Sequence, residues 1–128
     1  MQLENLECGA ACLGMVLAYY KKWVTLQQLR LDCGVSRDGI SIKNMITAAK
    51  KHGLDAKVYN YDMQTLKKGS SYPCIIQLGK NYFAVLKGFY RGFAFLNDPS
   101  KGELKVSVKQ LEKSFKGTGI AMWFYTFV

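Results

Sequence analysis

The first residues whose types and spacing suggest chemistry are Gln2 and Cys8, in the opening stretch MQLENLECGAACLGMVLAYY. We expect Cys8 to begin a helix, where unpaired backbone N–H groups and the helix dipole lower the pKa of a thiol from about 8.5. A thiolate there is a nucleophile for acyl transfer, and the Gln2 amide and the Cys8 N–H are suitable donors to the oxyanion that forms. The alternative is that Cys8 is a small buried residue like Cys12 and that Gln2 is solvated.

One carboxylate and the single histidine are the other two groups considered for a role in catalysis. Asp98, in LNDPSKGE, ends a predicted strand just before Pro99, where loops often carry catalytic side chains and where an aspartate can orient a base. Its alternative role is to cap the Asp-Pro turn. His52, the single histidine, precedes Gly53 at the end of a predicted helix, so we expect it to interact with the last carbonyl groups of that helix and not to act as a base.

The chain has four cysteines, and their spacing does not predict a metal site. Cys8 and Cys12 share one face of a predicted helix, but Cys33 and Cys74 come from unrelated segments, and no CxxC pair is present. We therefore expect no metal and no cofactor, and thiols that stay reduced in a cytosolic setting.

Three predicted helices come first and position the candidate nucleophile. Apolar residues recur at spacings of three and four from Cys8 to Lys22, which indicates a largely buried helix. A shorter helix is expected from Leu26 to Cys33, with Gly34 as its C-cap. A third helix is expected from its N-cap, Ser41, to about His52.

A series of short apolar segments, separated by Gly, Pro and Asp residues, follows these helices. Each has the length and composition of a strand: LDAKVYN, PCIIQLG, YFAVLKGFY, FAFLND and IAMWFYTFV. Helical turns are expected at Asp62–Lys68 and, with Ser107 as the cap, in SVKQLEKSF. Helices followed by strands predict an α+β fold with the helices packed on one face of an antiparallel sheet. The length predicts a single domain over residues 1–128.

The formal net charge of +9, from 18 Lys and Arg against 9 Asp and Glu, favours an acidic partner. The basic residues are scattered pairs such as Lys21-Lys22, and no nucleic-acid-binding motif accompanies them. We therefore expect an acidic peptide or an anionic membrane face as the partner, and no nucleic acid. No apolar run approaches the roughly 20 residues that span a bilayer, and the first segment lacks signal-peptide features, so we expect a soluble chain.

Several of these motifs occur together and in one order. The stretches QLENLECGAACLGMVLAYY, LQQLR, VSRDGISIKNMITAAKKHGLDA, PCIIQLGKNYFAVLKGF and FLNDPSKGE cover essentially the whole chain. Together they resemble the N-terminal peptidase domain of peptidase-containing ABC transporters, the bacteriocin exporters that remove double-glycine leader peptides. The resemblance implies a papain-like cysteine peptidase fold, a place on the cytoplasmic side of the bacterial cell membrane, and attachment to the membrane and ATPase domains of a transporter.

Position by position, the resemblance makes Cys8 the nucleophile, Gln2 the oxyanion-hole side chain and Asp98 the residue that orients the base. In the family the base is a histidine that opens the strand reading NYFAVLKGF here, and the matching position is Tyr82. A phenol with a pKa of about 10 keeps its proton at neutral pH, so it is a poor base and a poor proton donor to a departing amine. Losing a triad base costs on the order of 10⁶ in turnover in a serine protease, and we expect a smaller but still crippling loss here.

We therefore expect a degenerate peptidase domain that binds the acidic leader of a precursor peptide for export by an ABC transporter, and that cleaves it poorly or not at all. The alternative is an active cysteine peptidase that cuts after the double glycine. A third possibility is a cytosolic binding module unrelated to export, which would be favoured if Gln2, Cys8 and Asp98 did not converge.

Overall fold

The computed structural model describes the backbone of residues 2–34, 39–69, 72–79 and 81–124, and their side chains except those of residues 2–6 and 124. The described part of the chain forms five helices: α1 (Gln2–Tyr19), α2 (Leu26–Cys33), α3 (Ile42–Lys51), α4 (Met63–Gly69) and α5 (Val108–Ser114). It also forms six strands: β1 (Leu54–Asn60), β2 (Cys74–Gly79), β3 (Tyr82–Tyr90), β4 (Phe93–Asp98), β5 (Gly102–Ser107) and β6 (Thr118–Phe124). None of the described helices has the length and apolarity needed to span a membrane.

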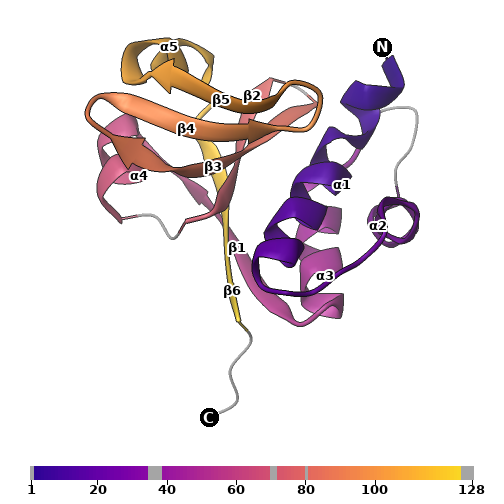
Figure 1. Cartoon of the computed structure of the whole chain (residues 1–128). Helices are drawn as coiled ribbons and strands as arrows, with labels where there is room; N and C mark the ends of the chain where they lie inside the picture. Colours follow the sequence, from indigo (N-terminus) through magenta and orange to yellow (C-terminus); the bar gives the residue numbers. More distant parts are fainter. Residues whose placement is uncertain (1, 35–38, 70–71, 80, 125–128) are drawn as a thin grey trace.

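The strands form one antiparallel sheet with helices on both faces. Their order is β1-β6-β2-β3-β4-β5, and α1, α2 and α3 lie together on one side (Figure 1). The predicted α+β fold, with the first helices packed on an antiparallel sheet, is therefore confirmed. The structure adds that α4 and α5 cover the other face of the sheet. The buried residues therefore form two clusters, one on each face, and Leu66 and Leu111 belong to the cluster under α4 and α5.

Alternating side chains in the central strands divide the core into these two clusters. In β2, Ile75 packs with α1 to α3, whereas its neighbour Ile76 packs with α4 and α5. In β3, Val85 and Leu86 divide in the same way. Because neighbouring side chains of a strand point to opposite faces, two buried faces require the continuous apolar runs that the sequence shows in these strands.

The predicted helix ends of α2, α3 and α5 are confirmed by their capping contacts. Thr25 accepts a hydrogen bond from the N–H of Gln28, and Gly34 ends α2 in the left-handed conformation. The hydroxyl groups of Ser41 and Ser107 likewise accept hydrogen bonds from backbone N–H groups at the starts of α3 and α5. These caps satisfy backbone groups that have no partner inside a helix.

The start of α1 differs from the prediction, because this helix begins at Gln2 and not at Cys8. Leu, Glu and Gln are good helix formers, and the residue directly before Cys8 is Glu7, which is not one of the usual N-cap residues. Cys8 therefore lies in the body of the helix, beyond the first turn where the effect of the dipole is concentrated.

Gly9 lets α1 pass close to the segment that leads into α3. A Cβ atom at Gly9 would lie 2.5 Å from Cγ2 of Ile40 and 2.9 Å from the sulfur of Met45, which is too close for any side chain. This close packing holds the turn of α1 that carries Cys8 against Ile40 and Met45.

Candidate active site

Cys8 is held against β3 by two hydrogen bonds to one backbone position. Its thiol donates to the carbonyl oxygen of Phe83 at 2.8 Å, and the N–H of Phe83 donates to the sulfur at 3.2 Å. The side chain is buried, so α1 presents the sulfur to the beginning of β3 and not to open solvent. The structure thus places the predicted nucleophile beside the strand that was predicted to carry its base.

The pKa of Cys8 lies below the usual value for a thiol. A hydrogen bond with the thiol of Cys12, one helical turn further along α1, is the largest cause, and the N–H of Phe83 acts in the same direction. Burial and the negative charge of Asp98 oppose these contacts. Burial raises the pKa of Cys12 itself well above the usual value, so Cys12 is a protonated donor that favours a thiolate at Cys8.

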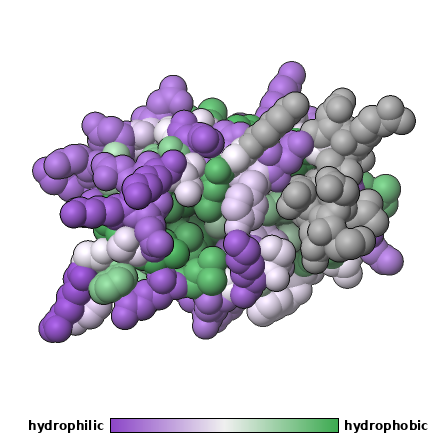
Figure 2. All heavy atoms as spheres, turned by 90° about the horizontal axis from the view of Figure 1, so that it is seen from above, coloured by the Kyte–Doolittle hydropathy of each residue, from purple (hydrophilic) through white to green (hydrophobic). Residues whose placement is uncertain are grey.

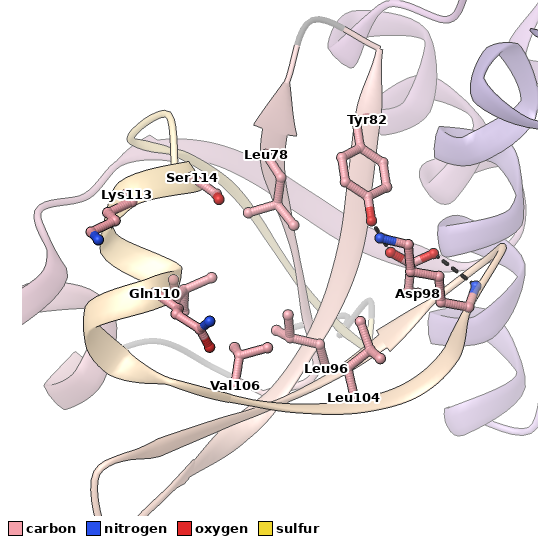
Figure 3. A pocket seen from close by; sticks show the side chains of 11 residues that line it. Leu78, Tyr82, Leu96, Asp98, Leu104, Val106, Gln110, Lys113 and Ser114 are labelled. Carbon is pink, nitrogen blue, oxygen red and sulfur yellow. Dashed lines mark hydrogen bonds between the residues drawn. The ribbon is translucent and has the colours of Figure 1, made fainter.

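Tyr82 and Asp98 meet at one end of the β3–β4 pair. Tyr82 is the first residue of β3 and Asp98 the last of β4, and the antiparallel register places Asn97 opposite Val85. The Tyr82 hydroxyl donates a hydrogen bond to Oδ2 of Asp98, as Figure 3 shows. The residue predicted to orient a base therefore binds the phenol that stands in the predicted position of that base.

Asp98 accepts further hydrogen bonds from the turn that follows it. Its Oδ1 accepts the N–H and the hydroxyl of Ser100, at 2.8 and 2.9 Å, and the N–H of Lys101 at 3.0 Å. Burial raises the pKa of this carboxyl group, but the hydrogen bonds from Tyr82, Ser100 and Lys101 outweigh burial and hold the pKa below its usual value. Asp98 thus remains ionised, and it both caps its turn and binds Tyr82.

The same contact makes Tyr82 a weaker acid than an ordinary phenol. Burial raises the pKa of Tyr82, and the hydrogen bond to ionised Asp98 raises it further. The phenolic proton is directed at Asp98, and a phenol oxygen that keeps its proton is a very weak base. Tyr82 is consequently unsuited both to accepting the Cys8 proton and to protonating a leaving amine.

A small cavity of about 180 Å³ brings the sulfur and the phenol together. Its wall is built from α1, α2, the start of β3 and the turn after β4: Glu7, Cys8, Ala11, Leu26, Tyr82, Pro99 and Ser100. Cys8, Tyr82 and the turn capped by Asp98 therefore lie around one cavity, and the catalytic roles expected for them stay predictions. The side chain of Gln2, the predicted oxyanion-hole residue, lies outside the described side chains.

The backbone N–H of Cys8 is in a different setting from the one predicted. Because α1 starts at Gln2, this N–H belongs to the hydrogen-bonded part of the helix, where it faces the preceding turn. The unpaired donors of a helix lie in its first turn. The Cys8 N–H is thus less available to an oxyanion than an N–H at a helix start.

His52 takes no part in this site. Its Nε2 lies 2.5 Å from Oδ2 of Asp32, and Oδ1 of the same carboxylate lies 2.7 Å from the Lys51 ammonium. His52 is the C-cap residue of α3, and it does not line the cavity at Cys8. Its side chain links the ends of α2 and α3, which was not predicted, whereas its backbone N–H meets the last carbonyl groups of α3 as expected from the sequence.

A second, larger hollow of about 430 Å³ adjoins the site, and sequence reasoning did not identify it. We call it the β5 groove. Its floor consists of apolar side chains from β2, β4, β5 and α5, namely Leu78, Leu96, Leu104, Val106 and Leu111, with Lys101 and Lys113 also lining it. Figure 3 shows Tyr82 and Asp98 at one side of this groove and α5 at the other. Figure 2 shows apolar side chains between hydrophilic ones on the face seen from above.

Among the described residues, no group of three or more His, Cys, Asp or Glu side chains is arranged to hold a metal ion. The described site contains the buried thiol of Cys8, the phenol of Tyr82 and the ionised carboxylate of Asp98, beside the β5 groove with its apolar floor. The phenol is hydrogen-bonded to the carboxylate and lines the same cavity as the thiol.

We expect iodoacetamide to label Cys8 in the folded protein in preference to the other cysteines, because Cys8 lines a cavity and has a lowered pKa. Cys12→Ala removes the donor that stabilises the thiolate, so the pKa of Cys8 should rise and alkylation at pH 7 should slow by roughly a factor of three or more. Cys33→Ala, which removes another buried thiol, is the control. The alkylation rate measured by mass spectrometry from pH 6 to 10 would argue against the Cys12 contact if both variants gave the wild-type profile.

A model of the Peptidase C39 family matches residues 1–124. Among curated proteins, the chain is similar to the colicin V secretion/processing ATP-binding protein of Escherichia coli, with 27% identity over 122 residues that cover 95% of the chain. It is also similar to the lacticin-481/lactococcin-DR transport/processing ATP-binding protein of Lactococcus lactis subsp. lactis, with 29% identity over 121 residues that cover 91% of the chain. The chain spans only 17% and 18% of the lengths of these two relatives.

Two solved structures are similar over nearly the whole chain. The first is a double glycine motif protease from an AMS/PCAT transporter in complex with the leader peptide; the TM-score is 0.93 and the identity 51%, over 98% of this chain and 89% of that one. The second is the peptidase domain of Streptococcus ComA, a bi-functional ABC transporter involved in a quorum sensing pathway; the TM-score is 0.86 and the identity 24%, over 93% of this chain and 92% of that one. This second likeness bears on the fold alone.

Proposed function

The chain belongs to the Peptidase C39 family, and we propose that it binds the leader region of a double-glycine precursor peptide while cleaving that peptide poorly or not at all. Residues 1–128 would form one peptidase-like domain of a longer peptide-exporting ABC transporter, on the cytoplasmic side of the membrane. The much greater length of the curated relatives supports the longer protein. The protease solved with its leader peptide supports the substrate class.

The observation that carries the proposed loss of cleavage is the hydrogen bond from Tyr82 to Asp98 beside Cys8. In a cysteine peptidase the base accepts the thiol proton and then delivers it to the departing amine. Here the thiol donates to the Phe83 carbonyl, which takes no proton, and the phenol donates to Asp98. Neither of these two hydrogen bonds therefore carries the thiol proton to the amine that leaves when the peptide bond breaks.

The β5 groove is the proposed binding site for the leader. Its apolar floor suits the apolar face of an amphipathic helix, which docks through side chains spaced one turn apart. Five lysines and only two glutamates lie between residues 101 and 116, the segment that forms β5 and α5. Such a surface attracts a peptide whose opposite face is acidic.

The contact between the groove and the Cys8 cavity also fits a double-glycine substrate. Tyr82 lines both hollows, so a helix in the groove would end beside the sulfur. The cavity is less than half the volume of the groove and is closed in by Ala11, Leu26 and Pro99. A backbone without side chains would enter it most readily.

An active peptidase remains the second candidate, because the pKa of Cys8 is lowered even without an adjacent imidazole. A larger thiolate fraction favours attack, since the thiolate is the nucleophile. It does not supply the proton that amide cleavage needs at the leaving nitrogen. For this reason we favour binding with weak cleavage.

A calorimetric titration tests the binding proposal. A peptide with an acidic amphipathic leader ending in two glycines should bind, and its Kd should weaken by roughly a factor of ten between 0.1 and 1 M salt, because the screening length falls from about 10 to about 3 Å. A scrambled peptide of the same composition keeps the charge but loses the apolar face, and should bind much more weakly. Absence of binding, or equal binding of the scrambled peptide, would exclude the proposed docking.

A further inference from the structure

A second apolar groove runs along the outer side of α1. Small residues at Ala11, Gly14 and Ala18 recur at spacings of three and four and therefore lie on one helix face. Leu26 and Leu29 of α2 form part of the opposite wall, and the two helices lie side by side in Figure 1. We call this hollow of about 330 Å³ the α1 groove; its lining also includes Met15 and Val24.

The α1 groove is apolar over its whole lining and extends to an exposed tryptophan. Each of its seven lining residues is apolar or glycine. Gly14, Ala18 and Val24 also line a smaller hollow, of about 200 Å³, that reaches Trp23. Trp23 is 78% exposed, although a large aromatic side chain gains free energy when its surface leaves water.

The α1 groove shares part of its wall with the cavity that contains Cys8. Ala11 and Leu26 line both hollows, so the two hollows adjoin between α1 and the start of α2. Tyr82 joins the same cavity to the β5 groove. The α1 groove and the β5 groove therefore both adjoin the cavity of Cys8, through different residues.

A substrate that occupies the β5 groove and passes the sulfur must leave the cavity by another path. From Cys8 to Ala18, the last residue of α1 that lines the second groove, the helix rises by roughly 15 Å at 1.5 Å per residue. An extended peptide covers this distance with about four or five residues at about 3.3 Å each. The groove thus has room for a short segment and not for a folded cargo.

We propose that the α1 groove binds the four or five residues that follow the double glycine, and that it favours apolar side chains there. This inference rests on the proposed function, because it assumes that a precursor peptide lies across Cys8. The occupant is the continuation of the same peptide chain, since the groove adjoins the cavity where the double glycine would lie. The domain would then recognise both sides of the cleavage position and not only the leader.

Peptides that differ only after the double glycine test this proposal by calorimetry. One ends at the double glycine, one continues with five apolar residues, and one continues with five serines. The apolar extension should tighten binding about tenfold, as expected for the burial of a few apolar side chains less the cost of ordering them. The serine extension should leave the Kd of the leader unchanged.

Matched variants locate the effect on the protein. Trp23→Ser should remove most of the gain from the apolar extension, whereas Leu31→Ser should keep it, because Leu31 is 76% exposed but lines neither hollow. Ala18→Trp, which fills the α1 groove, should also remove the gain and leave the Kd of the unextended leader as it is. Melting curves check that each variant is folded.

Failures of the two proposals are distinguishable. If the unextended leader does not bind, the proposed function is wrong. If the leader binds but the apolar extension adds nothing, or adds as much in Trp23→Ser as in Leu31→Ser, the inference about the α1 groove is wrong. Sedimentation that reveals a dimer lost in Ala18→Trp would assign the groove to a second copy of the chain and overturn the inference.

Discussion

Tyr82→His is expected to convert a weak or absent cleavage activity into a readily measured one, with a gain of roughly 10² to 10⁴ in kcat/KM on a double-glycine precursor. An imidazole with a pKa near 6.5 accepts the Cys8 proton and returns it to the leaving amine, which a phenol does not do. Asp98 is already ionised and already bonded to the side chain at this position. It is therefore placed to orient the imidazole. Mass spectrometry of the two products measures the gain.

Two controls separate this gain from general effects of the substitution. Tyr82→Phe removes the hydroxyl without adding a base and should stay inactive. Tyr82→His combined with Cys8→Ala should return to the background rate, because the nucleophile is missing. No gain in Tyr82→His, with leader binding intact, would mean that the base is not the only missing part. The setting of the Cys8 N–H within α1 would then be the next feature to change.

Val106→Glu is expected to weaken leader binding by about thirtyfold or more, the effect of losing a central apolar contact. Val106 lies on β5 and lines the β5 groove. The substitution places a negative charge where an apolar face and an acidic peptide would dock. A titration with the unextended leader measures the change in Kd.

Val58→Glu is the matched control, because it makes the same chemical change at a strand residue that is 42% exposed and does not line the groove. Both variants lower the net charge equally, so a long-range charge effect would weaken binding equally in both. A loss confined to Val106→Glu assigns binding to the groove. Equal losses would contradict that assignment.

Most of the fold could be predicted from local patterns in the sequence. The caps at Thr25, Ser41 and Ser107 set helix starts through contacts within three residues, and such contacts are visible in sequence. Strand β5 was missed, because GELKVS is short and directly follows the turn at Asp98. Its alternation of Leu104 and Val106 with charged residues was the available signal. The start of α1 at Gln2 was not predicted, because the apolar periodicity that indicates this helix begins only at Cys8, while the residues before it contribute helix propensity alone.

The site was predictable in part for a different reason. The proximity of Cys8 to the start of β3 is a contact across 75 positions of sequence, and only the family resemblance suggested it. The resemblance also suggested that the side chain at position 82 lies beside Asp98. Composition and spacing alone favoured a role for Asp98 as the cap of its turn. Neither groove was predicted, because each is formed by side chains from several elements whose relative positions are set by tertiary packing.

The proposed loss of cleavage is tested most directly by measuring binding and cleavage in one sample of the unmodified protein. A double-glycine precursor is titrated to establish that it binds, and the same mixture is then followed by mass spectrometry beside the Cys8→Ala variant. We predict binding with no more product than the Cys8→Ala sample gives, or only a trace above it. Cys8-dependent cleavage near 1 s⁻¹ or faster, the ordinary range for enzymes, would contradict the account and show that Tyr82 does not disable the site.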